Sequence, residues 1–211
     1  MDKQTVILQK QRSAAKVSVF RKTAAYHLTR MVVRLIARTS ITPNTITWTG
    51  FALSLAAGAL IISEQLFLAG FVVIIAGFFD MVDGALARNT ERVTLFGSIL
   101  DSTLDRLGEA AILLSLLVVF AREQSIPGII TVGLALLGSV MVSYIRAKAE
   151  ALGFTCELGL FTRPERVVVL SLGLLLSGID YALVTALIIV VIFSFITAGQ
   201  RLIHVWRQTR K

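Results

Sequence analysis

The sequence predicts an all-α, polytopic membrane protein: six transmembrane helices preceded by an amphipathic helix at the membrane surface. Two observations predict this class. Of the 211 residues, 55% are hydrophobic, and the mean hydropathy of +0.79 is well above that of soluble domains. Three stretches without a charged side chain, 44–63, 125–145 and 181–200, each reach the roughly 20 residues that a bilayer-crossing helix needs.

Three further spans are shorter or carry charge, at residues 66–87, 96–121 and 163–179. Charged side chains inside a span are costly against lipid, so these must face protein or water. The start of the 163–179 span is well defined, because Thr162 and Glu165 have the Thr-x-x-Glu spacing of a capping box, with proline in the first turn.

Residues 1–40 are predicted to form the basic surface helix, and residues 41–211 a single six-helix membrane domain. The segment before Asn44 holds nine of the 21 Lys and Arg residues and one acid. Between the predicted spans, the other face of the membrane has Arg122 as its one basic residue. Excess Lys and Arg marks the cytoplasmic side. We therefore expect a plasma-membrane protein with both termini, and the acidic residues described below, on the cytoplasmic side.

The composition also excludes some classes of function. A pI of about 10.3 would suit a nucleic-acid binder, but the basic residues flank spans and form no separate domain, so no nucleic-acid partner is expected. Cys156 is the single cysteine, and the two histidines are His27 and His204. Intrachain disulfides and zinc sites rich in cysteine or histidine are therefore excluded.

Four aspartates stand where one span ends and the next begins: Asp80, Asp83, Asp101 and Asp105. Positions three and four apart share a helix face, and two consecutive antiparallel helices are neighbours, so the four carboxylates should converge. Like charges at a membrane boundary need compensation, which a divalent cation supplies. Oxygen ligands favour Mg²⁺ or Mn²⁺, and a pair of such ions can clamp both oxygens of a phosphoryl displacement.

Small residues lie on the same two helix faces as the aspartates, at Gly84, Ala87 and Gly97. Small residues usually serve tight helix packing in lipid. Here, however, three small residues share helix faces with four acids, and this combination suggests that a substrate can approach the backbone closely. Arg88 ends the first stripe and could meet a phosphate or reach the membrane boundary as a snorkelling side chain.

The full pattern is Asp80-x2-Asp83-Gly84-x2-Ala87-Arg88-x8-Gly97-x3-Asp101-x3-Asp105. It resembles the signature of the CDP-alcohol phosphotransferase family at all eight defined positions, and the resemblance covers nearly the whole chain after Arg38. It implies a six-span membrane enzyme, commonly a homodimer, that transfers a phosphoalcohol from a CDP-linked donor to an acceptor hydroxyl and releases CMP.

The resemblance also implies roles for individual residues. Asp80, Asp83 and Asp101 would bind two Mg²⁺ or Mn²⁺ ions, and Asp105 would be both metal ligand and general base. The residues implied to contact the CDP part of the donor are Asn44, Thr45, Ile46, Thr47, Gly84, Arg88 and Thr94. Glu109, one turn beyond Asp105, is interpreted as a supporting residue.

Five further cations, at the ends of predicted spans on the side of the aspartates, are candidate ligands for the phosphate of an anionic acceptor: Arg146, Lys148, Arg163, Arg166 and Arg201. Positive-inside topology is the alternative explanation for each. Their segments resemble those of bacterial phosphatidylinositol phosphate synthases, with Arg146 and Lys148 in exchanged order and Thr162 where Glu is usual.

The predicted reaction therefore moves a phosphatidyl group from CDP-diacylglycerol to inositol 1-phosphate, a water-soluble phosphorylated polyol. Phosphatidylglycerol phosphate synthesis and archaetidylinositol phosphate synthesis are the alternatives within the family. A cation transporter is the alternative from another class, because intramembrane carboxylates also mark ion pathways.

Overall fold

The structure is a computed structural model that describes residue 33 and residues 42–90, 93–156 and 158–210. Six helices fill the described part of the chain, and no strand occurs there, which confirms the all-α class. The surface helix predicted for residues 1–40 lies outside the described residues, apart from Val33.

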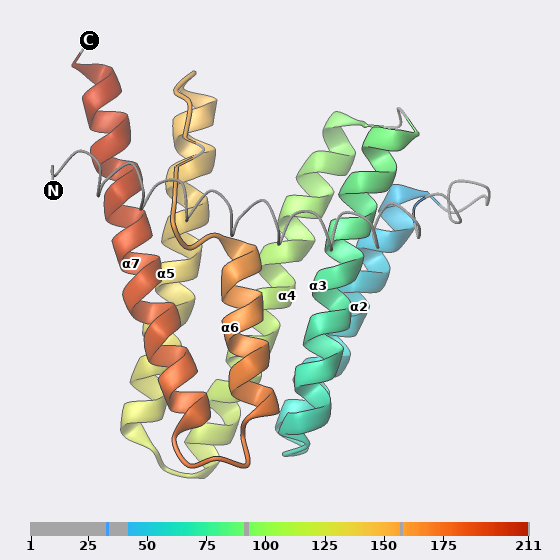
Figure 1. Ribbon diagram of the computed structural model, residues 1–211, viewed down its shortest axis with the longest axis vertical. Helices are drawn as coiled ribbons and strands as arrows, with labels where there is room; N and C mark the ends of the chain where they lie inside the picture. Colours follow the sequence, from blue (N-terminus) through green and yellow to red (C-terminus); the bar gives the residue numbers. More distant parts are fainter. Residues whose placement is uncertain (1–32, 34–41, 91–92, 157, 211) are drawn as a thin grey trace, which may run out of the picture.

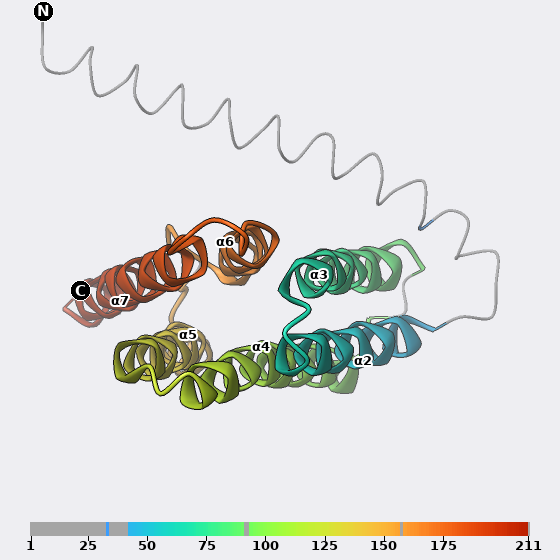
Figure 2. The same ribbon diagram turned by 90° about the horizontal axis from the view of Figure 1, so that it is seen from below.

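The helices are α2 (Pro43–Ile62), α3 (Leu66–Asn89), α4 (Leu95–Arg122), α5 (Ile126–Ala151), α6 (Arg163–Leu175) and α7 (Ala182–Thr209). They form two layers, with α3, α6 and α7 in one and α2, α4 and α5 in the other (Figures 1 and 2). Contacts run from α2 to α3, α6, α7, α5, α4 and back to α2. The helices therefore make a closed ring, and side chains that point inward can meet across it.

Local sequence explains where the helices start. The Thr42 hydroxyl caps α2 by accepting the Thr45 N–H at 3.3 Å, and the Thr94 hydroxyl caps α4 by accepting the Gly97 N–H at 2.9 Å. The capping box predicted for α6 is present: the Glu165 carboxylate accepts the Thr162 N–H at 2.9 Å.

Helix ends differ from the predicted spans in three places. α5 continues from residue 145 to Ala151 and α7 from residue 200 to Thr209, because a span limited by the first charge stops before charged residues that are good helix formers. α6 ends at Leu175 instead of residue 179. Turns replace its last residues, where Ser177, Gly178 and Asp180 favour turn conformations.

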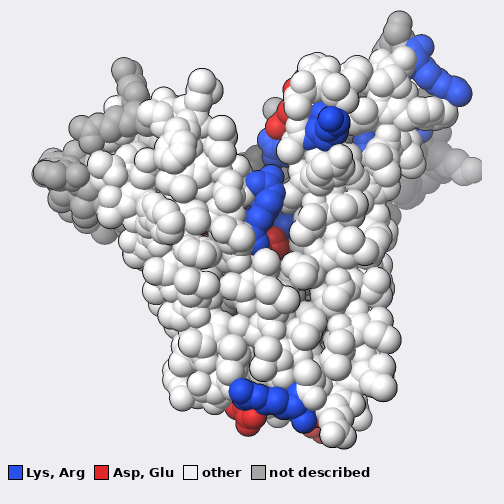
Figure 3. Space-filling model, turned by 180° about the vertical axis from the view of Figure 1, so that it is seen from behind, with Lys and Arg blue, Asp and Glu red and all other residues white. Residues whose placement is uncertain are grey.

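Four helices, α2, α3, α5 and α7, are long and apolar enough to cross a membrane. This confirms a multi-pass membrane protein. α4 has 28 residues but is charged in its first half, and α6 has only 13 residues, or about 20 Å at 1.5 Å per residue. A total of six crossing helices therefore stays a prediction. Figure 3 shows a broad band of uncharged surface between charged residues at the two ends.

Small residues bring the helices together. A Cβ added to Gly108 of α4 would lie 2.9 Å from Ser54 Oγ of α2, and one added to Gly138 of α5 would lie 2.9 Å from Ser194 Cβ of α7. Such close approach is typical of helix packing in lipid. Below the polar end of the ring, a buried apolar cluster that includes Leu116, Leu174 and Leu187 fills the interior.

Candidate active site

The four aspartates lie where α3 ends and α4 begins, at the polar end of the ring. Asp80, Asp101 and Asp105 each place a carboxylate oxygen within 4.8 Å of those of the other two. The sequence-based prediction of convergence is thus met by three of them. Asp83 is buried, at 3% exposed, and its Oδ1 accepts the N–H of Gly84 at 2.5 Å, so it stands apart from that cluster.

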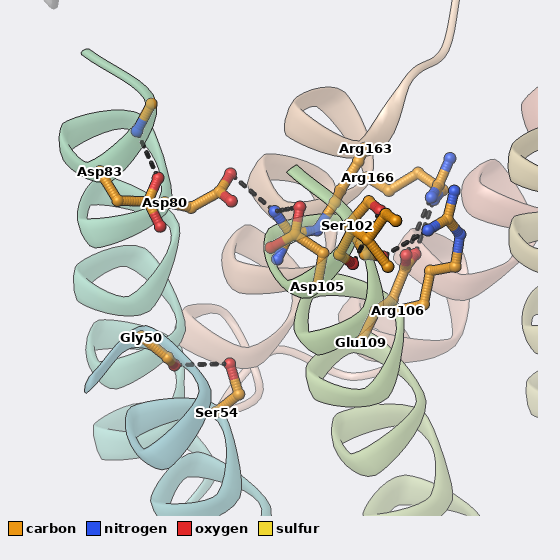
Figure 4. Close-up of polar contacts among 12 residues, drawn as sticks. Gly50, Ser54, Asp80, Asp83, Ser102, Asp105, Arg106, Glu109, Arg163 and Arg166 are labelled. Atoms are coloured by element: carbon orange, nitrogen blue, oxygen red, sulfur yellow. Dashed lines mark hydrogen bonds and ion pairs between the residues drawn. The ribbon is translucent and has the colours of Figure 1, made fainter. Parts of the chain in front are cut away.

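A guanidinium from α6 joins the carboxylates of α3 and α4. Arg163 Nη1 lies 2.6 Å from Asp80 Oδ2 and 2.7 Å from Asp105 Oδ2 (Figure 4). Arg163 is the first residue of α6, directly after the N-cap Thr162. The capping box that starts this helix therefore also positions the backbone of Arg163. One arginine therefore partly compensates two of the four negative charges.

A second arginine of α6 forms a buried pair with α4. Arg166 Nε and Nη2 donate to the two carboxylate oxygens of Glu109 at 2.6 and 2.8 Å, and the side chains are 3% and 10% exposed (Figure 4). This bidentate geometry is the strongest form of an Arg–carboxylate contact. Glu109, interpreted from the sequence only as a supporting residue, connects α4 to α6 across the ring.

The residues fit a divalent cation. In the described part of the chain, six buried side-chain polar atoms have no hydrogen-bond partner, and four of them are at this site: Asp83 Oδ2, Asp101 Oδ1, Arg163 Nε and Arg166 Nη1. Buried polar atoms are normally satisfied, so unpartnered carboxylate oxygens here indicate a ligand. The group of possible metal ligands found among the described residues consists of carboxylates alone, and oxygen donors suit Mg²⁺ or Mn²⁺.

Two cavities open on either side of the acidic cluster. The first, here called the glycine cavity, has a volume of about 290 Å³. Its lining includes Asn44, Thr47, Asp83, Gly84, Ala87, Arg88, Thr94, Gly97 and Asp101. Five of the seven residues implied to contact the CDP group are thus brought together. A Cβ at Gly97 would lie 2.8 Å from Thr94 Oγ1, so a side chain there would intrude on the cavity wall.

Thr45 and Ile46 do not line the glycine cavity. Adjacent helix positions point in different directions, so Asn44 and Thr47 share the cavity face while the residues between them do not. Thr45 is exposed and donates to the cap of α2, and Ile46 is buried against Val33, Val82 and Leu86. Of the four consecutive residues 44–47 that were predicted to contact the donor, only Asn44 and Thr47 line this cavity.

The second, here called the arginine cavity, has a volume of about 410 Å³. Its lining includes Ser98, Asp101, Asp105, Arg106, Arg146, Glu150, Arg163, Arg166 and Arg201. Ser98 and Asp101 line both cavities, so the acidic cluster touches their shared wall through Asp101, while Asp105 lines the arginine cavity but not the glycine cavity. In Figure 3, Lys and Arg side chains gather with an acidic patch in the cleft that divides this end of the molecule.

Four of the five predicted phosphate ligands line the arginine cavity, and Lys148 does not. Lys148 is exposed two residues after Arg146, and side chains two apart on a helix do not share a face. The sequence analysis missed Arg106. This residue directly follows Asp105 but is not one of the defined positions of the signature, so no pattern identified it. Nor did the sequence indicate which arginines would be paired with acids.

The comparisons with known proteins agree with this geometry. Residues 40–197 match the family described as CDP-alcohol phosphatidyltransferase. The chain is 34% identical to the archaetidylinositol phosphate synthase of Methanothermobacter thermautotrophicus, covering 86% of this chain and 91% of that protein. It is 33% identical to the phosphatidylinositol phosphate synthase of Mycobacteroides abscessus, covering 83% of this chain and 82% of that one.

Solved structures show the same architecture. The crystal structure of Mycobacterium tuberculosis phosphatidylinositol phosphate synthase with CDP-DAG bound matches with a TM-score of 0.77 and 33% identity, covering 85% of this chain and 94% of that chain. The structure of the same enzyme in complex with manganese and citrate has a TM-score of 0.76 and 34% identity, covering 84% and 88%.

Proposed function

Because this chain belongs to the CDP-alcohol phosphatidyltransferase family, we propose that it transfers a phosphatidyl group from CDP-diacylglycerol to inositol 1-phosphate, giving phosphatidylinositol phosphate and CMP. One observation supports the proposal most: Asp101, a member of the acidic cluster, lines both cavities. A transfer between two bound substrates needs the reacting groups of both at one place.

The glycine cavity is assigned to the donor. Arg88 and the small residues Gly84 and Gly97 line it, so a pyrophosphate could lie close to the backbone beside a cation. Asn44 and Thr47 of α2 supply polar groups for the nucleotide. The relative solved with CDP-DAG bound supports this class of donor.

Asp80, Asp83, Asp101 and Asp105 are proposed to hold two Mg²⁺ or Mn²⁺ ions, and a relative has been solved with manganese. Bound there, divalent ions neutralise the pyrophosphate and the charge that develops on departing CMP. Three of these carboxylates are already gathered, and Asp83 contributes from the wall of the glycine cavity.

Asp105 is assigned as the general base. It lines the arginine cavity, where the acceptor would sit, so its carboxylate can accept the proton of the attacking hydroxyl. The acceptor oxygen forms a bond to the lipid-linked phosphorus of the donor, and the pyrophosphate bond breaks with CMP as leaving group. Arg163 contacts Asp105 at 2.7 Å and orients it.

The lipid donor has a second candidate, the archaeol-linked form, because an archaetidylinositol phosphate synthase is a relative at 34% identity. The names of both relatives agree on an inositol phosphate product and differ in the lipid. The positive-inside pattern supports an orientation with both termini and the active site on the cytoplasmic side. The plasma-membrane location is part of the proposal and comes from the sequence-based expectation. The proposal also includes a homodimer, which the family resemblance implies, and a surface helix at residues 1–40, which the basic sequence of that segment predicts.

The test is CMP release by the purified protein in detergent with CDP-diacylglycerol and Mg²⁺ or Mn²⁺. Inositol 1-phosphate, glycerol 3-phosphate and serine are compared as acceptors, and CDP-archaeol as an alternative donor. CMP release that depends on inositol 1-phosphate is expected. Preferential use of glycerol 3-phosphate would reassign the acceptor, and absence of CMP with every acceptor would favour a cation transporter.

A further inference from the structure

The arginine cavity collects five arginines from four helices: Arg106 of α4, Arg146 of α5, Arg163 and Arg166 of α6, and Arg201 of α7. From the sequence alone, nothing distinguishes one of these arginines from another as a ligand for phosphate. They are not equivalent, because a guanidinium already paired with a carboxylate offers less charge to an incoming anion. The acceptor's phosphate should therefore prefer the arginines without a carboxylate partner.

Three of the five are paired. Arg146 Nε contacts Glu150 Oε1 at 2.7 Å. Arg163 bridges Asp80 and Asp105 at 2.6 and 2.7 Å. Arg166 uses Nε and Nη2 on Glu109 and retains only Nη1 without a partner. The ion pairs of Arg163 and Arg166 with acids of α3 and α4 hold the helices together. Because each of these guanidinium groups is neutralised by its carboxylate partners, it presents little positive charge to an anion in the cavity.

Arg106 and Arg201 differ from these three. Within residues 42–90, 93–156 and 158–210, neither has a carboxylate within 4.0 Å. Arg201 is 2% exposed and donates from Nε to Leu158 O and from Nη1 to Val142 O, so it is held by backbone carbonyls and has no carboxylate partner among the described residues. Arg106 is exposed, and its one hydrogen bond to a described residue, from Nη1 to Ser102 O, stays within α4.

The place of Arg106 connects it to the reaction. It lines the arginine cavity together with Asp101 and Asp105. Figure 4 shows its side chain on the same side of α4 as Glu109 and Arg166. A phosphate held there would keep the rest of a small polyol beside the proposed base. Its Nε and Nη2 have no partner in the described part of the chain, which leaves them for a two-point contact with phosphate oxygens.

We propose that Arg106 is a further acceptor-binding residue, which together with Arg201 supplies the uncompensated positive charge that holds the acceptor's phosphate. The proposal rests on the function proposed above. The competing explanation is that the Arg106 side chain only snorkels, keeping its charged head in water while its stem covers apolar surface. A snorkelling arginine would have no preference for a phosphorylated ligand, which separates the two explanations.

The variants are Arg106→Gln and Arg106→Lys. The matched control is Arg122→Gln at the C-terminal end of the same helix, where Arg122 donates to Ile62 O. For Arg106→Gln, the KM for inositol 1-phosphate should rise about 10-fold, the loss typical of one charge-assisted hydrogen bond. The KM for CDP-diacylglycerol should change less than twofold. Arg106→Lys should restore part of the acceptor affinity, and Arg122→Gln should behave like the parent protein.

Inorganic phosphate provides a readout that needs no turnover. Phosphate should raise the thermal unfolding temperature of the parent protein and of Arg122→Gln, and should do so less for Arg106→Gln. Equal phosphate stabilisation in all variants, or an equal rise of both KM values, would overturn the role of Arg106. Failure of the parent protein to release CMP with inositol 1-phosphate would instead refute the proposed function, while the phosphate experiment would still decide on Arg106.

Discussion

Breaking the buried pair between Glu109 and Arg166 should strongly destabilise the protein. The two side chains make a bidentate contact at 2.6 and 2.8 Å and are 10% and 3% exposed. Glu109→Leu fills a similar volume but leaves the buried guanidinium without its counter-charge. Removing one partner of a buried ion pair costs about 3–5 kcal/mol.

For a chain of this size, about 1 kcal/mol shifts the unfolding temperature by about 2–4 °C, so Glu109→Leu should lower it by about 6–20 °C. The double variant Glu109→Leu/Arg166→Met removes both charges and should recover most of the loss, since apolar replacement of a whole buried pair is often neutral. The assay is thermal unfolding in detergent at one fixed heating rate, because irreversible unfolding depends on that rate.

The matched control is the exposed pair of Arg146 and Glu150, at 2.7 Å with side chains 49% and 47% exposed. Solvent-exposed pairs contribute about 0–1 kcal/mol, so Glu150→Leu should shift the unfolding temperature by no more than about 4 °C. If Glu109→Leu behaved like Glu150→Leu, or if the double variant were as unstable as the summed single losses, the electrostatic reasoning about this site would be refuted.

Three further outcomes are expected. Asp105→Asn should lower kcat by about 10²- to 10⁴-fold with an unchanged circular dichroism spectrum; near-normal turnover would remove its assignment as base. Mn²⁺ at about 100 times its Kd should stabilise the protein by about 2.7 kcal/mol, and Asp80→Asn should lose most of this effect; equal stabilisation would exclude Asp80 as a ligand. Gly108→Val should destabilise by about 1–3 kcal/mol through overpacking, because its Cβ meets Ser54 Oγ at 2.9 Å, whereas Gly133→Ala, with nothing within 4 Å, should not.

The sequence predicted the parts of the fold that follow from periodicity and caps. The α6 start at Arg163 came from a local capping box, and α2 and α4 begin within one residue of their predicted spans. Helix ends on the polar side were less predictable. Charge marks where a membrane core ends, but helices continue past that point, as α5 and α7 do.

The candidate site divides in the same way. Spacing within one or two neighbouring helices predicted that Asp80, Asp101 and Asp105 would meet. Pairing across the ring could not be predicted, because Glu109 and Arg166 are 57 positions apart, and nothing in the sequence fixes how α6 faces α4. For the same reason the sequence could not show which arginines would contact a carboxylate and which would not.

The electrostatics of the site explain why α6 departs from the rest of the bundle. Asp80, Asp105 and Glu109 lie on α3 and α4, and the cations that contact them, Arg163 and Arg166, both come from the first turn of α6. A full-length span would carry its N-terminus toward one membrane face, whereas a helix of 13 residues can start inside the ring, level with the acids. Arginine at a helix N-terminus opposes the helix dipole, so this placement is unfavourable by itself. The carboxylates of α3 and α4 offset it, so the start of this short helix brings two guanidinium groups to the acidic residues.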